Sequence, residues 1–127
     1  HISMSMPSAF LTKPVRWTGA SYRDFFGFPQ EVKSEMGYAL FVAQIGGRHR
    51  KAKNLKGFGD AGIVEIVDDH RGDTYRAIYT VRFASAVYVL HAFQKKSKSG
   101  IATPKSDLRL IEQRLREAER IHKETGT

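Results

Sequence analysis

The chain has 127 residues, of which 41% are hydrophobic and 11% aromatic, so it is long enough to form one domain with its own core. It contains no cysteine, which excludes disulfides, thiolate chemistry and cysteine-based zinc sites, and its five histidines are too scattered to predict a metal site. The net charge of +8 favours a polyanionic partner, which is either a nucleic acid or an acidic protein.

The ends of the chain carry little structural signal. The first residues, HISMSMPSAF, lack the basic and apolar segments of a signal peptide. We expect residues 1–12 to be a mobile tail or a vector remnant, residues 13–123 to form one domain, and residues 124–127 to be a second tail. No apolar run approaches the ~20 residues of a spanning helix, and the lack of cysteine suits the cytoplasm. We therefore expect a cytoplasmic protein with no membrane segment, metal or cofactor.

The first third of the chain predicts a short strand and two helices. Residues 13–17 alternate in character and predict the strand. Thr18 or Ser21 is a candidate cap for a short helix that ends at Gly27, and Pro29 suits the first turn of a second helix. Apolar residues recur at helical spacing up to the double glycine in IGG, where the second helix is predicted to end. These apolar residues are Val32, Met36, Ala39, Leu40 and Ala43.

A strongly basic loop follows, with the sequence RHRKAKNLKGFGDAG and no acidic residue before Asp60. Cations concentrated in one loop suit the phosphates of a nucleic acid. A solvated surface loop is the plain alternative. The predicted RNA contacts in this loop are Arg48, Arg50, Lys51, Lys53 and Lys56.

Three strand-like runs and a helix complete the chain. The runs 63–69, 74–83 and 86–95 are rich in Val, Ile and Tyr, and the short polar segments between them predict antiparallel pairing. A last helix begins near Thr103 and Pro104, with an apolar stripe at Leu108, Ile111, Leu115 and Ala118. The order predicts an α+β fold, in which an antiparallel sheet of about four strands combines with two N-terminal helices and a C-terminal helix. We expect one face of the sheet to remain free for a ligand.

Strict alternation along the strands predicts which side chains share a face. Arg76 and Arg82 lie on one face of the strand 74–83. If that face joins the polar face of the last strand, arginine, histidine and lysine gather at one end of the sheet. The predicted face of the last strand consists of Val87, Val89, His91, Phe93 and Lys95.

Such a group of residues suits the cleavage of RNA by its own ribose 2′-hydroxyl. Arg76 and Lys95 would stabilise the charged phosphorane, and His91, with an ordinary pKa near ~6.5, would move a proton. Each residue also has a structural alternative. Arg76 would pair with Glu65 on the neighbouring strand, His91 would be a surface or hydrogen-bonded residue, and at least two of the strand tyrosines would pack in the core. The remaining predicted RNA contacts are Tyr79, which would stack a base, and Arg82, Lys96 and Lys98.

The order of the segments resembles that of a known family. FPQEVKSEMGYALFVAQIGG, NLKGFGDAGIVEIV, TYRAIYTVRF and VYVLHAFQKKSKSGIATPKSDLRLIEQRLREA together resemble a phage-derived, HigB-like branch of the RelE/ParE toxin superfamily, over roughly residues 13 to 120. The most specific parts are YRxxY and LHAFQKKS followed by TPKSDLxLIxxRLxE. The resemblance implies a compact α+β fold like that of the microbial ribonucleases.

The resemblance also implies a function. RelE- and HigB-like toxins of type II toxin–antitoxin systems cleave mRNA in the ribosomal A site without a metal and leave a 2′,3′-cyclic phosphate. The implied partners are a HigA-like helix-turn-helix antitoxin, the ribosome and mRNA. The ParE branch implies a different function, in which the toxin poisons gyrase. A third alternative is a phage-derived domain that binds RNA or protein without catalysis.

The site residues of the family match this sequence in part. The catalytic strand arginine of RelE-like toxins matches Arg76, and the basic residue that closes the last strand matches Lys95. The paired lysines on the first strand of the meander are not matched, because Val64 and Glu65 stand there. HigB-like toxins rely on a histidine near the carboxyl end, a role that His91 matches loosely.

Overall fold

The computed structural model describes residues 12–59, 62–95 and 103–125. Within these ranges the chain forms three helices and five strands. Residues 1–11 and 126–127 of the predicted tails lie outside the described residues, whereas residues 124 and 125, predicted as tail, belong to the last helix. None of the described helices is long and apolar enough to cross a membrane. The elements in chain order are β1 (Val15–Trp17), α2 (Ser21–Phe26), α3 (Gln30–Gln44), β2 (Ala52–Asn54), β3 (Ile63–His70), β4 (Asp73–Thr80), β5 (Val87–Lys95) and α4 (Lys105–Thr125).

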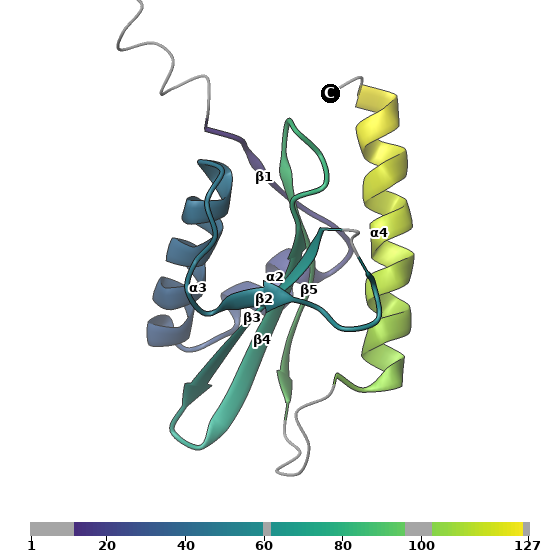
Figure 1. Ribbon diagram of the computed structural model, residues 1–127. Helices are drawn as coiled ribbons and strands as arrows, with labels where there is room; N and C mark the ends of the chain where they lie inside the picture. The colour runs from purple at the N-terminus through teal and green to yellow at the C-terminus, as the bar shows by residue number, and fades with distance from the viewer. Residues whose placement is uncertain (1–11, 60–61, 96–102, 126–127) are drawn as a thin grey trace, which may run out of the picture.

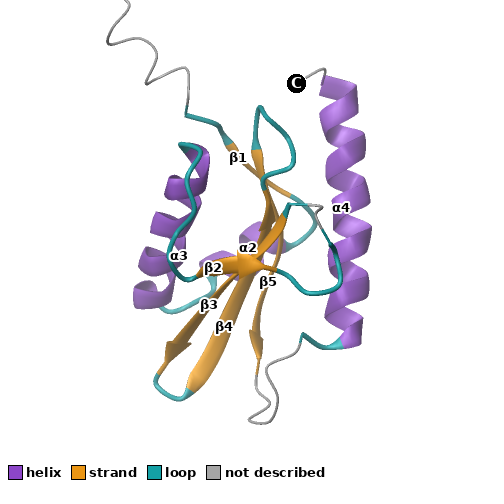
Figure 2. Cartoon of the chain, in the orientation of Figure 1, coloured by secondary structure: helices purple, strands orange, loops and turns teal. Residues whose placement is uncertain are grey.

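The five strands form one sheet in the order β1-β5-β4-β3-β2. β2, β3, β4 and β5 pair antiparallel, whereas β1 pairs parallel to β5. Helices α2 and α3 cover one face, and the long helix α4 covers the other (Figures 1 and 2). The predicted α+β fold is confirmed. The prediction of about four strands missed the three-residue strand β2, and the expectation of a free face is wrong because α4 packs there.

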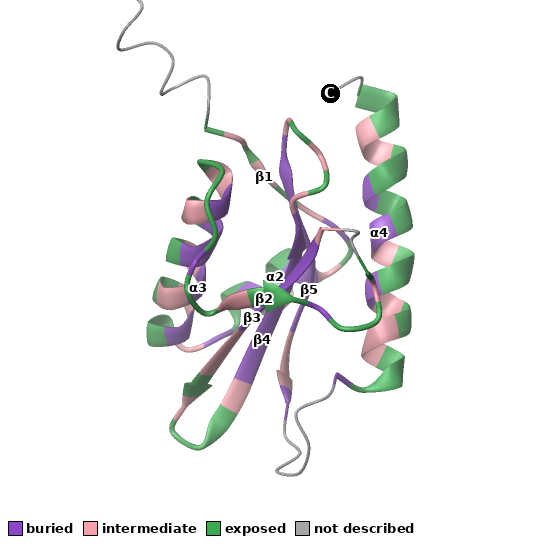
Figure 3. Cartoon of the chain, viewed as in Figure 1, coloured by how far each residue is buried: buried purple, intermediate pink, exposed green. Residues whose placement is uncertain are grey.

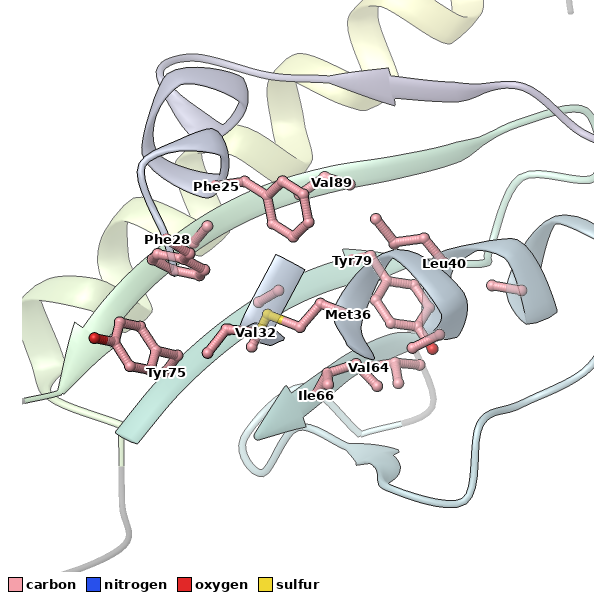
Figure 4. Packing of buried hydrophobic residues seen from close by; sticks show 14 of the residues in the cluster. Phe25, Phe28, Val32, Met36, Leu40, Val64, Ile66, Tyr75, Tyr79 and Val89 are labelled. Atoms are coloured by element: carbon pink, nitrogen blue, oxygen red, sulfur yellow. The ribbon is translucent and has the colours of Figure 1, made fainter. Parts of the chain in front are cut away.

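Each face of the sheet buries its own hydrophobic core (Figure 3). Under α2 and α3, the side chains of Phe25, Val32 and Met36 pack against strand residues that include Val64 and Tyr79 (Figure 4). The predicted apolar face of α3 is therefore confirmed. The second core lies under α4 and consists of Leu55, Ile63, Ile78, Ala86, Tyr88, Leu90, Ile111, Leu115 and Ala118.

A β-bulge in β5 changes which residues share a face. Ile78 is the Cα partner of His91, but its neighbour Tyr79 is the partner of Val89, so Leu90 is an extra residue in the ladder. Val89 consequently packs under α3, while Leu90 and His91 lie on the α4 side. The predicted grouping of Val87 and Val89 with His91 is wrong, since strict alternation does not allow for the bulge.

Arg114 of α4 binds the backbone at this bulge. Its Nη1 atom donates to the carbonyl oxygen of Leu90 at 3.0 Å. Its guanidinium also lies against Gly19 in the turn between β1 and α2, where an added Cβ would be 2.5 Å from the Nε atom of Arg114. One side chain of α4 thus contacts the bulge and lies against this turn, where Gly19 leaves room for it.

Two alanine substitutions should shift stability in opposite directions. Gly19→Ala should lower the free energy of unfolding by about 1–3 kcal/mol, because Gly19 has a φ of +52° and a Cβ there meets Arg114. Gly37→Ala should raise it by about 0.5–1 kcal/mol, because Gly37 lies inside α3 and a Cβ there meets nothing within 4 Å. Urea unfolding measures both, and shifts of the same sign would contradict this account.

Candidate functional site

A cleft of about 260 Å³ opens on the α4 side of the sheet. Its floor is formed by strands β3 and β4, one wall by β2 and the turn after it, and the other wall by the start of α4. We call it the Arg76 cleft. Its lining residues are Lys53, Asn54, Leu55, Lys56, Glu65, Arg76, Thr103 and Leu108.

A buried ion pair lies at the floor of the Arg76 cleft. Arg76 is 4% exposed and Glu65 is 5% exposed. The Nη1 atom of Arg76 donates to the Oε2 atom of Glu65 at 2.9 Å, and the hydroxyl oxygen of Thr103 lies 3.4 Å from the same nitrogen. The predicted structural alternative, an ion pair between Arg76 and Glu65, is confirmed. Each charge compensates the other, which is what permits both in the middle of a sheet.

Lysines form the rim of this cleft. Lys53 is the direct cross-strand partner of Glu65, and its Nζ atom lies 3.9 Å from the Oε1 atom of Glu65. Lys56 lines the same cleft from the turn after β2 and is exposed. The cleft therefore combines a carboxylate that can accept a proton, a guanidinium that can bind an anion, and two ammonium groups at its mouth. Sequence reasoning treated Glu65 only as a partner for Arg76.

His91 is bound between two residues of α4. Its Nε2 atom lies 2.8 Å from the Oδ1 atom of Asp107, and its Nδ1 atom lies 3.5 Å from the Nη1 atom of Arg114. Burial lowers the pKa of His91, an effect that the hydrogen bond and charge of Asp107 oppose only in part. The partners indicate a neutral ring that donates from Nε2 to Asp107 and presents Nδ1 to Arg114.

The structure does not bring His91 into the Arg76 cleft. Phe93 is the cross-strand partner of Arg76, and its ring stacks on His91 with 4.7 Å between centroids. His91 instead lines a separate groove of about 640 Å³ beside α2, together with Arg23 and Asp24. Arg76 and His91 therefore lie on one face but in different openings.

The other predicted site residues lie in several places. Lys95 is buried at the end of β5, opposite Thr74, and its register places it on the Arg76 face. Arg82 follows the C-terminal end of β4, at the other end of that strand from Lys95, and pairs with Glu119 of α4. Tyr79 faces α3 instead, is 1% exposed, and burial raises its pKa to about 12, so its ring has no face open to a base. Lys96 and Lys98 lie outside the described residues.

The predicted basic loop divides between the two faces of the molecule. Lys53 and Lys56 line the Arg76 cleft. Lys51 pairs with Glu35 of α3 and with Asp68, each at 3.4 Å, on the other side. Arg48 donates to the Oδ1 atom of Asn54 at 2.9 Å, and Arg50 is exposed. Only two of the five predicted loop cations therefore reach the cleft.

These features define a small basic α+β protein. Its sheet is covered by helices on both faces, and a cleft on one face contains a buried ion pair. The chain matches the model of the family described as phage-derived protein Gp49-like (DUF891) over residues 23–116. It belongs to that family. No curated protein matches the chain in sequence.

Two solved structures have a distantly similar shape. One is the Escherichia coli toxin RelE, as a double arginine-to-alanine mutant in the free state, with 17% identity and a TM-score of 0.48 over 64% of this chain and 81% of that chain. The other is the toxin–antitoxin complex RelBE2 from Mycobacterium tuberculosis, with 22% identity and a TM-score of 0.39 over 68% of this chain and 95% of that chain.

The lowered pKa of His91 predicts a stability that depends on pH. The unfolded chain, with a histidine pKa near ~6.5, binds this proton more readily than the folded chain does. The contribution of His91 is therefore complete above ~6.5 and is lost as the pH falls below it. Urea unfolding of the wild type and of His91→Gln, from about pH 8 to about pH 5, should give a steeper loss for the wild type. Parallel profiles would contradict the assignment.

Proposed function

We propose that the chain is the toxin of a type II toxin–antitoxin system and that it cuts mRNA on the ribosome, in the cytoplasm. The observation that carries the proposal is the buried pair of Arg76 and Glu65 at the floor of a cleft with lysines at its rim. Cleavage of RNA through its 2′-hydroxyl needs a proton acceptor beside that hydroxyl and cations around the phosphate. The cleft supplies both from side chains alone.

In this proposal each charged group has one role. The carboxylate of Glu65 accepts the proton of the ribose 2′-hydroxyl, whose oxygen then forms a bond to phosphorus. Arg76 stabilises the negative charge of the phosphorane. The bond from phosphorus to the 5′-oxygen breaks, Lys53 donates a proton to that oxygen, and the products carry a 2′,3′-cyclic phosphate and a 5′-hydroxyl. Lys56 binds the RNA backbone at the rim, and Lys95 adds positive charge to the same face.

His91 has a different role in this proposal from the catalytic one that its chemistry first indicated. Its Nε2 atom binds Asp107 and its Nδ1 atom faces Arg114, so both ring nitrogens contact α4. It is therefore a positioning residue, which holds the first turns of α4 where Thr103 and Leu108 form a wall of the cleft. The proposed partners remain the ribosome, mRNA and a HigA-like helix-turn-helix antitoxin.

Expression in cells without the antitoxin tests this function. The wild type should arrest growth and leave new mRNA 5′ ends at in-frame positions of translated messages. Glu65→Gln and Arg76→Ala should each lower cleavage by at least ~100-fold, because each removes one charge that acts on the reacting groups. Lys51→Ala is the matched control, because this cation lies outside the cleft and should leave cleavage unchanged.

Two results would overturn this proposal in different ways. Double-strand DNA breaks with intact mRNA would indicate a gyrase poison and refute the ribonuclease. Full cleavage by both Glu65→Gln and Arg76→Ala would leave the ribonuclease intact and refute the site. Circular dichroism of each variant distinguishes lost chemistry from lost folding.

A further inference from the structure

The large exposed apolar side chains of the described residues all belong to one side of the molecule. They lie on α2 and α3 or directly after α3, on the far side of the sheet from the Arg76 cleft (Figures 1 and 3). They fall into two groups: Tyr22 and Phe26 on α2, which contact the ring of Trp17, and Tyr38, Phe41 and Ile45 along α3. The five side chains are 56%, 47%, 59%, 48% and 52% exposed, in that order. Exposed apolar side chains that lie together on a highly charged chain usually mark a binding surface.

Three of these side chains form a stripe along α3. Tyr38, Phe41 and Ile45 are spaced three and four residues apart, so they lie one above another on the helix surface. The buried residues of α3 occupy its opposite side, toward the sheet. We call these three residues the α3 stripe. The spacing is the one with which a helix presents anchors to a second helix.

Gly37 adds space beside this stripe. An added Cβ at Gly37 would meet nothing within 4 Å, so the packing of the described residues does not require glycine there. Glycine inside a helix is nevertheless unfavourable relative to alanine. A glycine beside exposed aromatic side chains lets the backbone of a second helix approach α3 closely.

The loop after α3 gives one side of the stripe a positive charge. His49 lies 3.4 Å from Glu35 and its ring contacts the ring of Tyr38, with 5.6 Å between centroids, so the loop turns back along the helix. Glu35 is matched by His49 and Lys51. Arg48 and Arg50, which we call the basic flank, are exposed. Arg48 donates a hydrogen bond to Asn54, but neither arginine forms an ion pair with an acid of the described part of the chain.

We propose that the α3 stripe and the basic flank bind an acidic amphipathic helix of a protein partner. This inference rests on the proposed function, in which that partner is the antitoxin. Apolar residues of that helix cover Tyr38, Phe41 and Ile45, and its acids pair with Arg48 and Arg50. A second copy of this chain fits less well, since it would bring a second basic flank and another charge of +8. RNA also fits less well, because Ile45 offers no ring on which a base can stack.

Calorimetric titration with the purified HigA-like helix-turn-helix protein that the proposed function names as the antitoxin tests the surface. Exchange of Tyr38 and Phe41 for lysine in one variant should weaken binding by at least ~30-fold, because it removes two central anchors. Tyr22→Lys is the matched control, because its ring is equally exposed but lies on α2, and it should bind as the wild type does. Exchange of Arg48 and Arg50 for glutamate should weaken binding and reduce its dependence on salt.

Growth assays separate this inference from the proposed function. The lysine variant should arrest growth as the wild type does, because the sheet lies between the stripe and the Arg76 cleft, but co-expressed antitoxin should no longer rescue the cells. If the wild type arrests no growth, the proposed function fails, while the titration still decides the docking surface. Circular dichroism and urea unfolding establish that the variants are folded.

Four results would overturn the docking surface. The lysine variant binding the helix-turn-helix protein like the wild type is the first, and a wild type that does not bind that protein at all is the second. The third is a dimer of the wild type, detected by sedimentation, that the lysine variant loses, since the stripe then binds a second copy. The fourth is a lysine variant that no longer cleaves mRNA but still binds the antitoxin, since the stripe then contacts RNA.

Discussion

The hydrogen bond from Arg114 to the carbonyl oxygen of Leu90 holds the arrangement of the α4 face in place. Leu90 is the extra residue of a β-bulge, and a bulge leaves a carbonyl group without its ladder partner. By binding that group, Arg114 joins α4 to β5 at the point where the strand changes face. The ring of His91 therefore lies on the α4 side, where its Nε2 atom contacts the carboxylate of Asp107. The first turn of α4, which carries Leu108, is then fixed as a wall of the Arg76 cleft.

A buried ion pair on this face carries a cost that apolar residues would avoid. Arg76 and Glu65 occupy positions in the middle of the sheet where two well-packed apolar side chains often give equal or greater stability. The loss of either charge alone would leave the other buried without its compensation. Stability favours apolar side chains at these two positions, whereas binding of an anion in a cleft with a basic rim requires charged ones. This conflict is why we propose the site at Arg76 rather than at the equally buried His91, whose ring nitrogens contact α4.

Much of the fold follows from patterns within single segments. The apolar residues of α3 and α4 recur at helical spacing, and the runs around Val64, Tyr79 and Val89 have the composition of strands, so these elements were predictable. The strand β2 was not, because Ala52–Asn54 is short and mostly polar, and its strand conformation depends on pairing with β3. The bulge at Leu90 was not predictable either, because no residue near it has a special backbone requirement. Both misses arise from contacts between segments, and the bulge altered the composition of the candidate site.

The cations of the basic loop do not form one surface, and this division affects the interpretation of the charge of the chain. The simplest interpretation of a run of cations in a sequence is one surface that binds one polyanion. Here the chain passes from α3 to the edge of the sheet within this run, so Arg48 and Arg50 lie in the loop that directly follows the α3 stripe, while Lys53 and Lys56 line the cleft. These four cations of the loop therefore have different neighbours, which are aromatic and apolar side chains for one pair and an ion pair in a cleft for the other. In the two proposals, the cations beside apolar anchors bind an acidic protein helix, and the cations above a guanidinium and a carboxylate bind a phosphodiester. The proposals thus assign the two partners raised by composition alone to different faces of one molecule.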